Sequence, residues 1–514
     1  MKASTMPRLL TVLLGATFLA GCSLIPDYER PASPVPASWP QGAAYKPVST
    51  AQPGQPLADE IAWDDFFLDP GLRRLIAIAL ENNRDLRVST LNVAAAEAQF
   101  RAQHGTLYPE LGATGSASYQ QTPADLTSAG AARTAPVTSR TFSTGVGITA
   151  YELDLFGRLR SLSQSAFENY LSLEETRKAA QITLVASVAD AYLTLLANRE
   201  LLDLTRRTLE SQETSLRLTR AAAAGGTATD LTLHQAQTAV ETARANLALY
   251  TRQLAQAENA LAELIGQPLP ADLPIPADLD SALMMADVPA GLSSEVLLRR
   301  PDVLAAERVL RSANADIGAA RAAFFPSITI TGSYGTSGAA LSRLFQPYSG
   351  TWSFLPQINV PIFTGGINEA NLDYAKLQKN IQVANYEKAI QAAFRETADA
   401  LAARGTYEDQ LRAQQSLTDN YAESYRLSQL RFRSGVDNFL TTLISQRDLY
   451  AAQQELITLR QARLANLVTL YKVLGGGWRQ HGTQPSPRFE ANVHGSQATR
   501  SKAPDRQQEA RRRS

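Results

Sequence analysis

Two short stretches decide the fold: GGTATDLT at residues 225–232 and SGVDNFLT at residues 434–441. Glycine after a long helical pattern indicates a tight reversal of the chain. The two stretches align at a constant offset of 209 residues, and the same offset pairs Gly226 with Gly435, Leu231 with Leu440, Thr232 with Thr441, Gln237 with Gln446 and Gly266 with Gly475. Such repetition predicts a pseudo-symmetric architecture in which one unit is used twice.

Long helices lead into and away from both reversals. Proline is absent from 157–267 and from 362–484, although average usage would place about five or six prolines in each gap. At 1.5 Å per residue, a first outbound helix beginning at Gly157 would be about 96 Å long. The sequence predicts four long helices, at 157–220, 227–265, 365–433 and 436–474.

The apolar stripes on these helices indicate neighbours on both sides. The first outbound helix carries two stripes, one of which contains Ile182, Val185 and Ala189. The return helix has a single seam whose spacing alternates between four and three residues, as in a coiled coil. Its members are Ala236, Val240, Ala243, Leu247, Tyr250, Leu254, Ala257, Leu261 and Leu264. A helix with two seams fits a wall or cylinder of helices better than a simple hairpin.

Four shorter zones alternate between apolar and polar uncharged residues, which is the period of a strand. They lie at about 111–120, 140–151, 327–336 and 351–361. Strands of about ten residues with these two faces fit a membrane barrel with a wet lumen, although a half-buried soluble sheet has the same period. Four strands cannot close a barrel, whereas three chains would supply twelve and leave room for an aqueous channel. A conduit would therefore be a trimer.

The N-terminus carries an export signal. Its apolar run at 9–20 is too short to span a bilayer as a mature helix but is typical of a signal peptide core. The run ends at Gly21-Cys22, and Cys22 is the only cysteine. We expect residues 1–21 to be removed and Cys22 to carry covalent acyl chains that tether the protein to a membrane. The alternative is a plain signal peptide with an incidental cysteine.

The remaining segments complete the domain organisation. A proline-rich leader cannot be helical and should run extended over a surface, while the basic C-terminal tail has the composition of a disordered segment. The expected divisions are the leader at 22–57, the first repeat at 58–266, an equatorial linker at 267–300, the second repeat at 301–478 and the tail at 479–514.

Composition and motifs exclude several classes of protein. With 49 basic and 49 acidic residues the formal net charge is zero, which disfavours electrostatic capture of nucleic acid. A single cysteine rules out an internal disulfide framework, and four scattered histidines do not suggest a metal site. Nucleophile-elbow, zinc-protease and phosphate-loop motifs are absent from the sequence. We therefore expect no enzyme and no cofactor other than the lipid at Cys22.

Several motifs together resemble the outer-membrane factors of tripartite efflux and secretion systems, the TolC-like family, and most closely its drug-efflux lipoprotein branch. The resemblance covers nearly all of residues 22–478. The motifs are CSLIPDY from Cys22, YELDLFG from Tyr151, RPDVL from Arg300, FFPS from Phe324, FTGG from Phe363, RSGVD from Arg433 and YKVLGGGW from Tyr471.

This resemblance implies a mixed α and β membrane protein that forms a homotrimer. A twelve-stranded barrel in the outer membrane, with four strands per chain, would continue into a helical barrel that crosses the periplasm. A periplasmic adaptor (membrane fusion) protein and an inner-membrane transporter of the RND type would dock at the helix tips. Residues 58–82 and 268–300, with the C-terminal helix, would form a girdle around the helical barrel. Ser23 after the cysteine weakly favours the outer membrane by analogy with lipoprotein sorting.

The tips supply the candidate functional residues. Adaptor contact is expected at the reversals and their flanks, namely Leu218, Thr219, Arg220, Gly225, Gly226, Ser428, Arg431, Gly435 and Val436. A resting gate is expected on the second return helix, where relatives carry a leucine, an aspartate and an arginine in a Leu-x-x-x-Asp-x-x-Arg frame. This chain has Leu440, Ile444 and Arg447 in that frame. An apolar constriction would therefore replace an acidic ring, and Asp230 or Asp437 would pair with Arg447.

Two alternatives to an efflux duct remain at this point. A protein-secretion exit channel of type I systems would use the same fold. A lipid-tethered coiled-coil spacer would explain the helices but not the four amphipathic strands.

Overall fold

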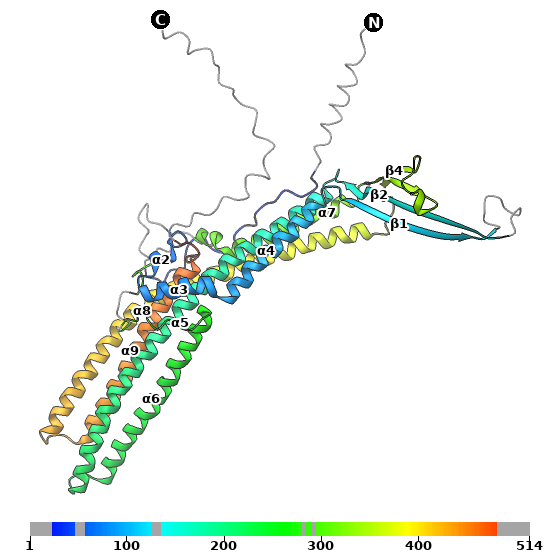
Figure 1. The fold of residues 1–514 in the computed structure, drawn as a ribbon. Helices are drawn as coiled ribbons and strands as arrows, with labels where there is room; N and C mark the ends of the chain where they lie inside the picture. The colour runs from blue at the N-terminus through cyan, green and yellow to red at the C-terminus, as the bar shows by residue number, and fades with distance from the viewer. Residues whose placement is uncertain are drawn as a thin grey trace, which may run out of the picture.

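A computed structural model describes residues 23–46, 57–124, 135–276, 278–279, 283–288 and 294–480. The molecule is long and bent, with a sheet at one end and the tips of paired helices at the other (Figure 1). The signal peptide, Cys22 and residues 481–514 of the tail lie outside the described residues.

The strands form one antiparallel sheet in the order β1-β2-β3-β4, built from β1 (Leu111–Thr122), β2 (Val137–Leu153), β3 (Ser327–Gly338) and β4 (Gly350–Asn359). The strand register pairs apolar residues with apolar residues on one face of the sheet and serines with serines on the other. Apolar partners face each other across strands, as Tyr334 does Trp352. On the other face, serine hydroxyls hydrogen-bond across strands at 2.7 Å, Ser116 to Ser143 and Ser333 to Ser353. The sheet therefore has one apolar and one hydroxyl-lined face.

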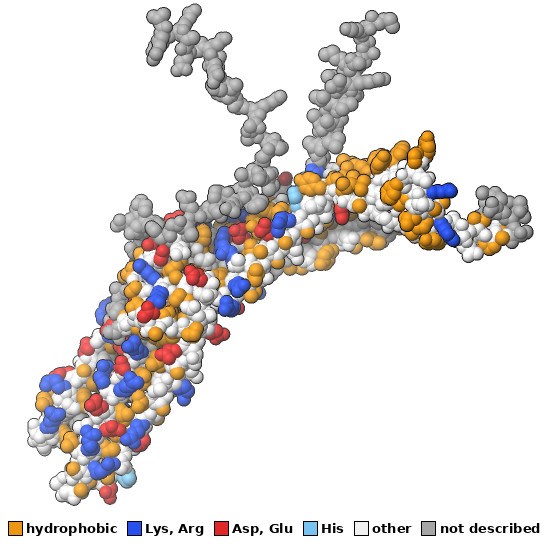
Figure 2. Space-filling model, in the orientation of Figure 1, with side chains coloured by type: hydrophobic (Ala, Val, Ile, Leu, Met, Phe, Trp, Pro, Cys, Tyr) orange, Lys and Arg blue, Asp and Glu red, His pale blue; other side chains and the backbone are white. Residues whose placement is uncertain are grey.

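No other part of the described chain covers the apolar face. Tyr334, Trp352 and Phe354 are 71%, 76% and 60% exposed, and hydrophobic side chains gather over the sheet in Figure 2, whereas charged ones gather over the helices. Large apolar side chains on such a strand face require lipid or another chain against them.

Two continuous helices of 67 residues each connect the sheet to the tips: α5 (Arg158–Ala224) and α8 (Ile367–Arg433). A helix of that length spans about 100 Å. Near the tips they pack with the return helices α6 (Asp230–Ile265) and α9 (Phe439–Val473). Nearer the sheet their partners are α4 (Arg84–Gly105) and α7 (Pro301–Ala322), which the sequence analysis did not predict as helices.

Local chemistry explains where the helices begin. The expected starts at 227 and 436 were each three residues early, because Thr229 and Asn438 act as N-caps and accept hydrogen bonds from the amides three residues later. Gly157 and Gly366 precede α5 and α8 with positive φ angles of 75° and 84°, a conformation that favours glycine.

A girdle packs on one side of the helical layer where the repeats meet. It contains α2 (Trp63–Phe66), α3 (Pro70–Asn82) and the short 3₁₀ helix η3 (Ser294–Arg299). Phe66 stacks on Tyr471 of α9 with ring centroids 4.0 Å apart. Tyr192 of α5 donates a hydrogen bond to the Asp69 carboxylate over 3.0 Å. The largest cluster of buried apolar side chains lies at this level.

The described part of the leader, 23–46, runs along the second repeat. Arg30 and Arg311 both pair with the buried Glu307 of α7, at 2.7 and 2.8 Å. Farther along, Trp39 stacks on Phe394 of α8. Specific contacts with α7 and α8 therefore hold the leader in place, as expected of an extended segment that runs over a surface.

Helix α5 contains an 18-residue window apolar enough to cross a membrane by length and composition, but 56% of that window is buried inside the protein. This is weak support for a span, because a core helix passes the same test. Within the described residues, the sheet provides the surface that suits a membrane.

Candidate functional site

The two reversals share one backbone geometry. At the first, the amides of Gly226 and Thr227 donate to the carbonyls of Ala223 and Ala222, at 3.0 and 2.9 Å. At the second, the amides of Gly435 and Val436 donate to Phe432 and Arg431, again at 3.0 and 2.9 Å. Both motifs need a left-handed residue, and Gly226 and Gly435 supply it with φ angles of 75° and 73°.

The tips differ in charge. At the second tip the Arg431 guanidinium forms two hydrogen bonds to the Asp437 carboxylate, at 2.6 and 3.0 Å. These hydrogen bonds from Arg431 hold the pKa of Asp437 below its usual range. At the equivalent positions of the first tip, 209 residues earlier, stand Ala222 and Ala228.

The proposed docking residues divide into two groups. Leu218 and Val436 are 69% and 62% exposed, and Arg220, Gly225, Gly226, Arg431 and Gly435 are exposed as well. Thr219 and Ser428 are buried, and each hydroxyl donates to a backbone carbonyl of its own helix, that of Ser215 or Tyr425. These two side chains are turned into the protein, so Thr219 and Ser428 are less suited to adaptor contact than the exposed residues of the same set.

The candidate gate residues meet in one groove near the second tip. Leu440, Ile444 and Arg447 of α9 line it together with Gln212 of α5 and Gln235 of α6. Leu440 and Ile444 remain 38% and 41% exposed. Residues four apart share one helix face, and the structure places both on the same groove.

The expected closing ion pairs are not formed within the chain. Arg447 pairs with its neighbour Asp448 at 2.9 Å, and Asp437 is engaged by Arg431. Asp230 lies in the first turn of α6, where a carboxylate interacts favourably with the positive end of the helix dipole. The repeat in the sequence could not show which groups pair, because the Arg431 side chain reaches Asp437 across the turn.

A polar seam above the groove was missed by the sequence analysis. The buried Thr205 hydroxyl of α5 lies 2.8 Å from the Tyr450 hydroxyl of α9, and Gln446 donates to Ser211 over 3.1 Å. Asn246 of α6 also donates to the Tyr450 hydroxyl, at 3.3 Å. Paired hydroxyl and amide groups at seam positions could have been noticed as a signal, because buried polar groups require partners.

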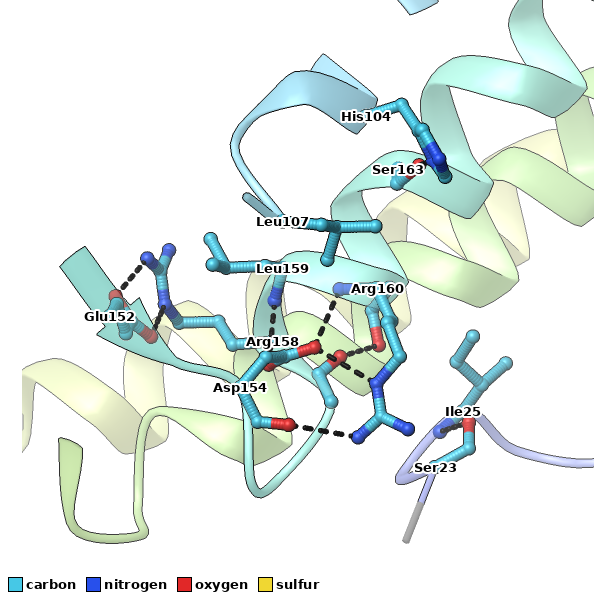
Figure 3. A network of polar contacts seen from close by, with 12 residues as sticks. Ser23, Ile25, His104, Leu107, Glu152, Asp154, Arg158, Leu159, Arg160 and Ser163 are labelled. Atoms are coloured by element: carbon cyan, nitrogen blue, oxygen red, sulfur yellow. Dashed lines mark hydrogen bonds and ion pairs between the residues drawn. The ribbon is translucent and has the colours of Figure 1, made fainter. Parts of the chain in front are cut away.

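The junction between sheet and helix is fixed by ion pairs (Figure 3). Asp154 accepts hydrogen bonds from the backbone amides of Leu159 and Arg160, at 3.0 and 2.9 Å, and thereby caps α5. Arg158 makes a two-bond pair with Glu152 at the end of β2. These contacts connect β2 rigidly to α5.

The described leader begins beside this junction. Ile25 and the Ser161 hydroxyl leave no room for a Cβ at Gly318, since they would lie 2.6 and 2.7 Å from it. Arg321 of α7 donates to the Leu24 carbonyl over 3.2 Å. The described leader therefore begins close to the base of the sheet.

The described residues hold no cluster of three or more His, Cys, Asp or Glu side chains placed to bind a metal ion. The site is thus made of two helix tips, an apolar groove and a sheet with a hydroxyl-lined face. A sheet with an exposed apolar face and a hydroxyl-lined face, continued by long helices, is typical of a channel protein that lies in a membrane at one end.

Comparison with known proteins agrees with this class. The family model for outer membrane efflux protein matches residues 75–267 and 292–476, and the chain belongs to that family. A toluene efflux pump outer membrane protein, TtgC of Pseudomonas putida, is 50% identical over 476 residues, covering 93% of this chain and 97% of the relative. The outer membrane protein OprJ of Pseudomonas aeruginosa is 44% identical over 468 residues, covering 91% and 95%.

A solved structure has the same fold. The open state of the MtrE outer membrane channel of Neisseria gonorrhoeae superposes with a TM-score of 0.81 at 39% identity, covering 90% of this chain and all of that one. The fold is therefore that of a trimeric outer-membrane channel with a mixed α and β protomer. The protein is an outer-membrane exit duct of efflux pumps, with a transport role. The four-stranded sheet argues against the tethered-spacer alternative, and membership of the efflux family favours efflux over protein secretion.

Proposed function

We propose that this duct is anchored by lipid at Cys22, docks through its tips on a periplasmic adaptor and an RND-type transporter, and exports apolar toxic compounds. The observation that carries the proposal is the position of the exposed tip residues at the end of the molecule remote from the sheet (Figure 1). A partner that reaches the duct from the inner membrane would meet this end first. The relative described as a toluene efflux pump protein supports apolar cargo.

At rest the duct closes at the second return helix. Three copies of Leu440 and Ile444 around the axis would form an apolar constriction that excludes water by dewetting. A relative solved in an open state supports a duct that changes between states. Opening would rotate the α9 face away from the axis when the adaptor engages the adjoining tip.

Docking is tested by placing a photo-crosslinking residue at Leu218 or Val436 in cells that express the adaptor. We expect crosslinks to the adaptor from both positions. A crosslinker at Thr219 or Ser428 should give none, because these side chains are packed within the chain. The docking proposal is contradicted if all four positions give the same crosslinking pattern.

The anchor is tested separately by palmitate labelling of wild type and Cys22→Ala. We expect the variant to lose the label while keeping much of its export, because the barrel also holds the protein in the membrane. Sensitivity of a deletion strain to toluene, complemented by each variant, reports export. Label retained by Cys22→Ala would rule out the lipid assignment without affecting the duct.

A further inference from the structure

A charged cavity lies where α9 ends and α7 begins. The long helices α5 and α8 run past this level, whereas α9 stops at Val473 and α7 starts at Pro301. A cavity of about 600 Å³ remains between the four helices. Its lining includes six charged side chains, namely Asp190, Arg300, Asp302, Glu396, Asp399 and Lys472.

Arg300 engages two of the four acids. Its guanidinium donates to Asp302 at 3.0 and 2.7 Å and to Glu396 at 2.9 Å, and it also donates to the Val473 carbonyl at the end of α9. Asp190 and Asp399 remain, with the single ammonium of Lys472 opposite them. The cavity lining therefore has an excess of negative charge.

The buried carboxylate of Asp190 has few groups that stabilise its negative charge. Its Oδ1 is buried and has no hydrogen-bond partner in the described part of the chain. Burial raises the pKa of Asp190 to about 6, and attraction to Lys472 offsets only part of that rise. An orphan carboxylate oxygen in a native structure calls for an explanation beyond packing.

The carboxylates face away from the girdle. Asp190 precedes Tyr192, which is bonded to the girdle residue Asp69, by two positions, and two helical residues turn a side chain through about 200°. Asp399 follows Phe394, which stacks on the leader, by five positions, or about 140°. The girdle and leader pack on one side of α5 and α8, so Asp190 points to the opposite side of the helical layer and Asp399 is turned toward that side.

The internal repeat relates the two acids. Asp399 lies 209 residues after Asp190, the offset that also relates the two tips. The short helices beside the two acids begin with different residues: Asn83 is the N-cap of α4 and Arg300 is the N-cap of α7. Both donate to a carbonyl near the end of a return helix, Asn83 to Leu264 at 2.9 Å and Arg300 to Val473 at 3.0 Å. Both long helices therefore carry an aspartate at this level, although the short helices beside them have diverged.

We propose that Asp190 and Asp399 form a belt of six carboxylates around the lumen of the trimer, at the level of the girdle, and that this belt makes the duct selective for cations. The proposal rests on the trimeric duct described above. Rings of acidic side chains attract cations in channels, and low-dielectric walls strengthen their field. At the second tip, position 444 is isoleucine, where the relatives' motif has an aspartate. The acidic ring of this chain would therefore lie at the girdle, far from the tip.

The belt responds to pH through Asp190. The charged groups that share its cavity are Lys472 on α9, Arg300 and Asp302 at the start of α7, and Glu396 and Asp399 on α8, and of these Lys472 acts on its pKa. Asp190 is neutral below its raised pKa and charged above it. Cation selectivity therefore rises as the pH increases through about 6.

The test is the potassium-to-chloride permeability ratio of purified trimers in planar bilayers under a KCl gradient. Asp399→Asn and the double variant with Asp190→Asn are compared with wild type. Asp272→Asn is the matched control, because this exposed aspartate lies on the girdle side, paired with Arg74. Each protein is also measured with Leu440→Ser and Ile444→Ser, so that a closed tip does not hide the belt.

We expect the ratio to fall about threefold or more in the double variant, less in Asp399→Asn, and not at all in the control. Lowering the pH from about 7.5 to about 5 should reduce the wild-type ratio but not that of Asp190→Asn. Asp399 is exposed within the chain, so its replacement tests the belt even if Asp190→Asn fails to assemble. An unchanged potassium-to-chloride ratio in intact trimers overturns the belt. Trimers that conduct neither with nor without Leu440→Ser and Ile444→Ser contradict the duct itself.

Discussion

The two helix tips have the same backbone and different chemistry. Both turn through a left-handed glycine and restart at a capped helix. The second adds the Arg431–Asp437 pair and the exposed Leu440 and Ile444 on its return helix. The first carries alanines in place of the pair, and Leu231 and Gln235 where the gate residues stand. Backbone geometry has thus been kept in both repeats, while charge and apolar surface are concentrated in one.

This difference indicates a division of labour. In the proposed docking, a shared turn would let both tips contact the same kind of partner. An ion pair across only one turn limits the conformations of that loop, and an apolar face beside it suits a constriction. The predictions below test this asymmetry, beginning with the largest expected effect.

The gate pair should give the largest difference between the repeats. Replacing Leu440 and Ile444 with serine should wet the constriction and raise single-channel conductance about severalfold, because an apolar pore closes by excluding water. Cells should also become more sensitive to vancomycin. Leu231→Ser with Gln235→Ser is the matched control in the first repeat and should change neither. Equal effects from the serine replacements in the two repeats would show that the gate is not confined to the second tip.

The glycines should behave alike at the two tips. Alanine at Gly226 or Gly435 would occupy a left-handed conformation, at a cost of about 1–2 kcal/mol in the free energy of local opening. Space is not the cause, since a Cβ at either position meets no atom within 4 Å. Hydrogen exchange of the tip amides measures the effect. Gly225→Ala, at a φ of −82°, should show no such loss, and a loss there would point to crowding instead.

The ion pair should matter at the second tip only. Arg431→Gln removes both hydrogen bonds to Asp437 and should lower adaptor crosslinking from Val436 about twofold, since an exposed pair makes a small contribution. Because the pKa of Asp437 is held below its usual range by Arg431, the pair stays charged at neutral pH and is lost only in strong acid. Wild-type crosslinking should therefore not change between about pH 5 and 8. A decline over that range would mean that another group controls docking.

Transplanting the pair should have the smallest effect. Ala222→Arg with Ala228→Asp would place the same charges across the first turn, and either single change is the control. Hydrogen exchange at the first tip should slow slightly in the double variant and in neither single variant. A gain in both singles would show that helix propensity, not pairing, is responsible.

Much of the architecture could be predicted from periodicity and repetition. The described strands contain or closely overlap the expected ranges, and the four long helices lie where proline is absent. Helices α4 and α7 were not predicted, because they lie outside the two proline-free zones from which the long helices were inferred. For the tips, Leu218 and Val436 are exposed as a docking role requires, whereas Thr219 and Ser428 are buried. Sequence spacing alone could not separate them, since exposure depends on the neighbouring helix.

What the sequence by itself determined is the position of the four long helices and the two faces of each strand, because these follow from local preferences with a period of two or 3.6 residues. Only the tertiary structure decided the partners. It assigned Asp437 to Arg431 and not to Arg447, connected Tyr450 to Thr205, and brought Asp190 and Asp399 to one cavity. Contacts between residues far apart in the chain depend on how whole helices pack against one another, and no local pattern specifies that packing.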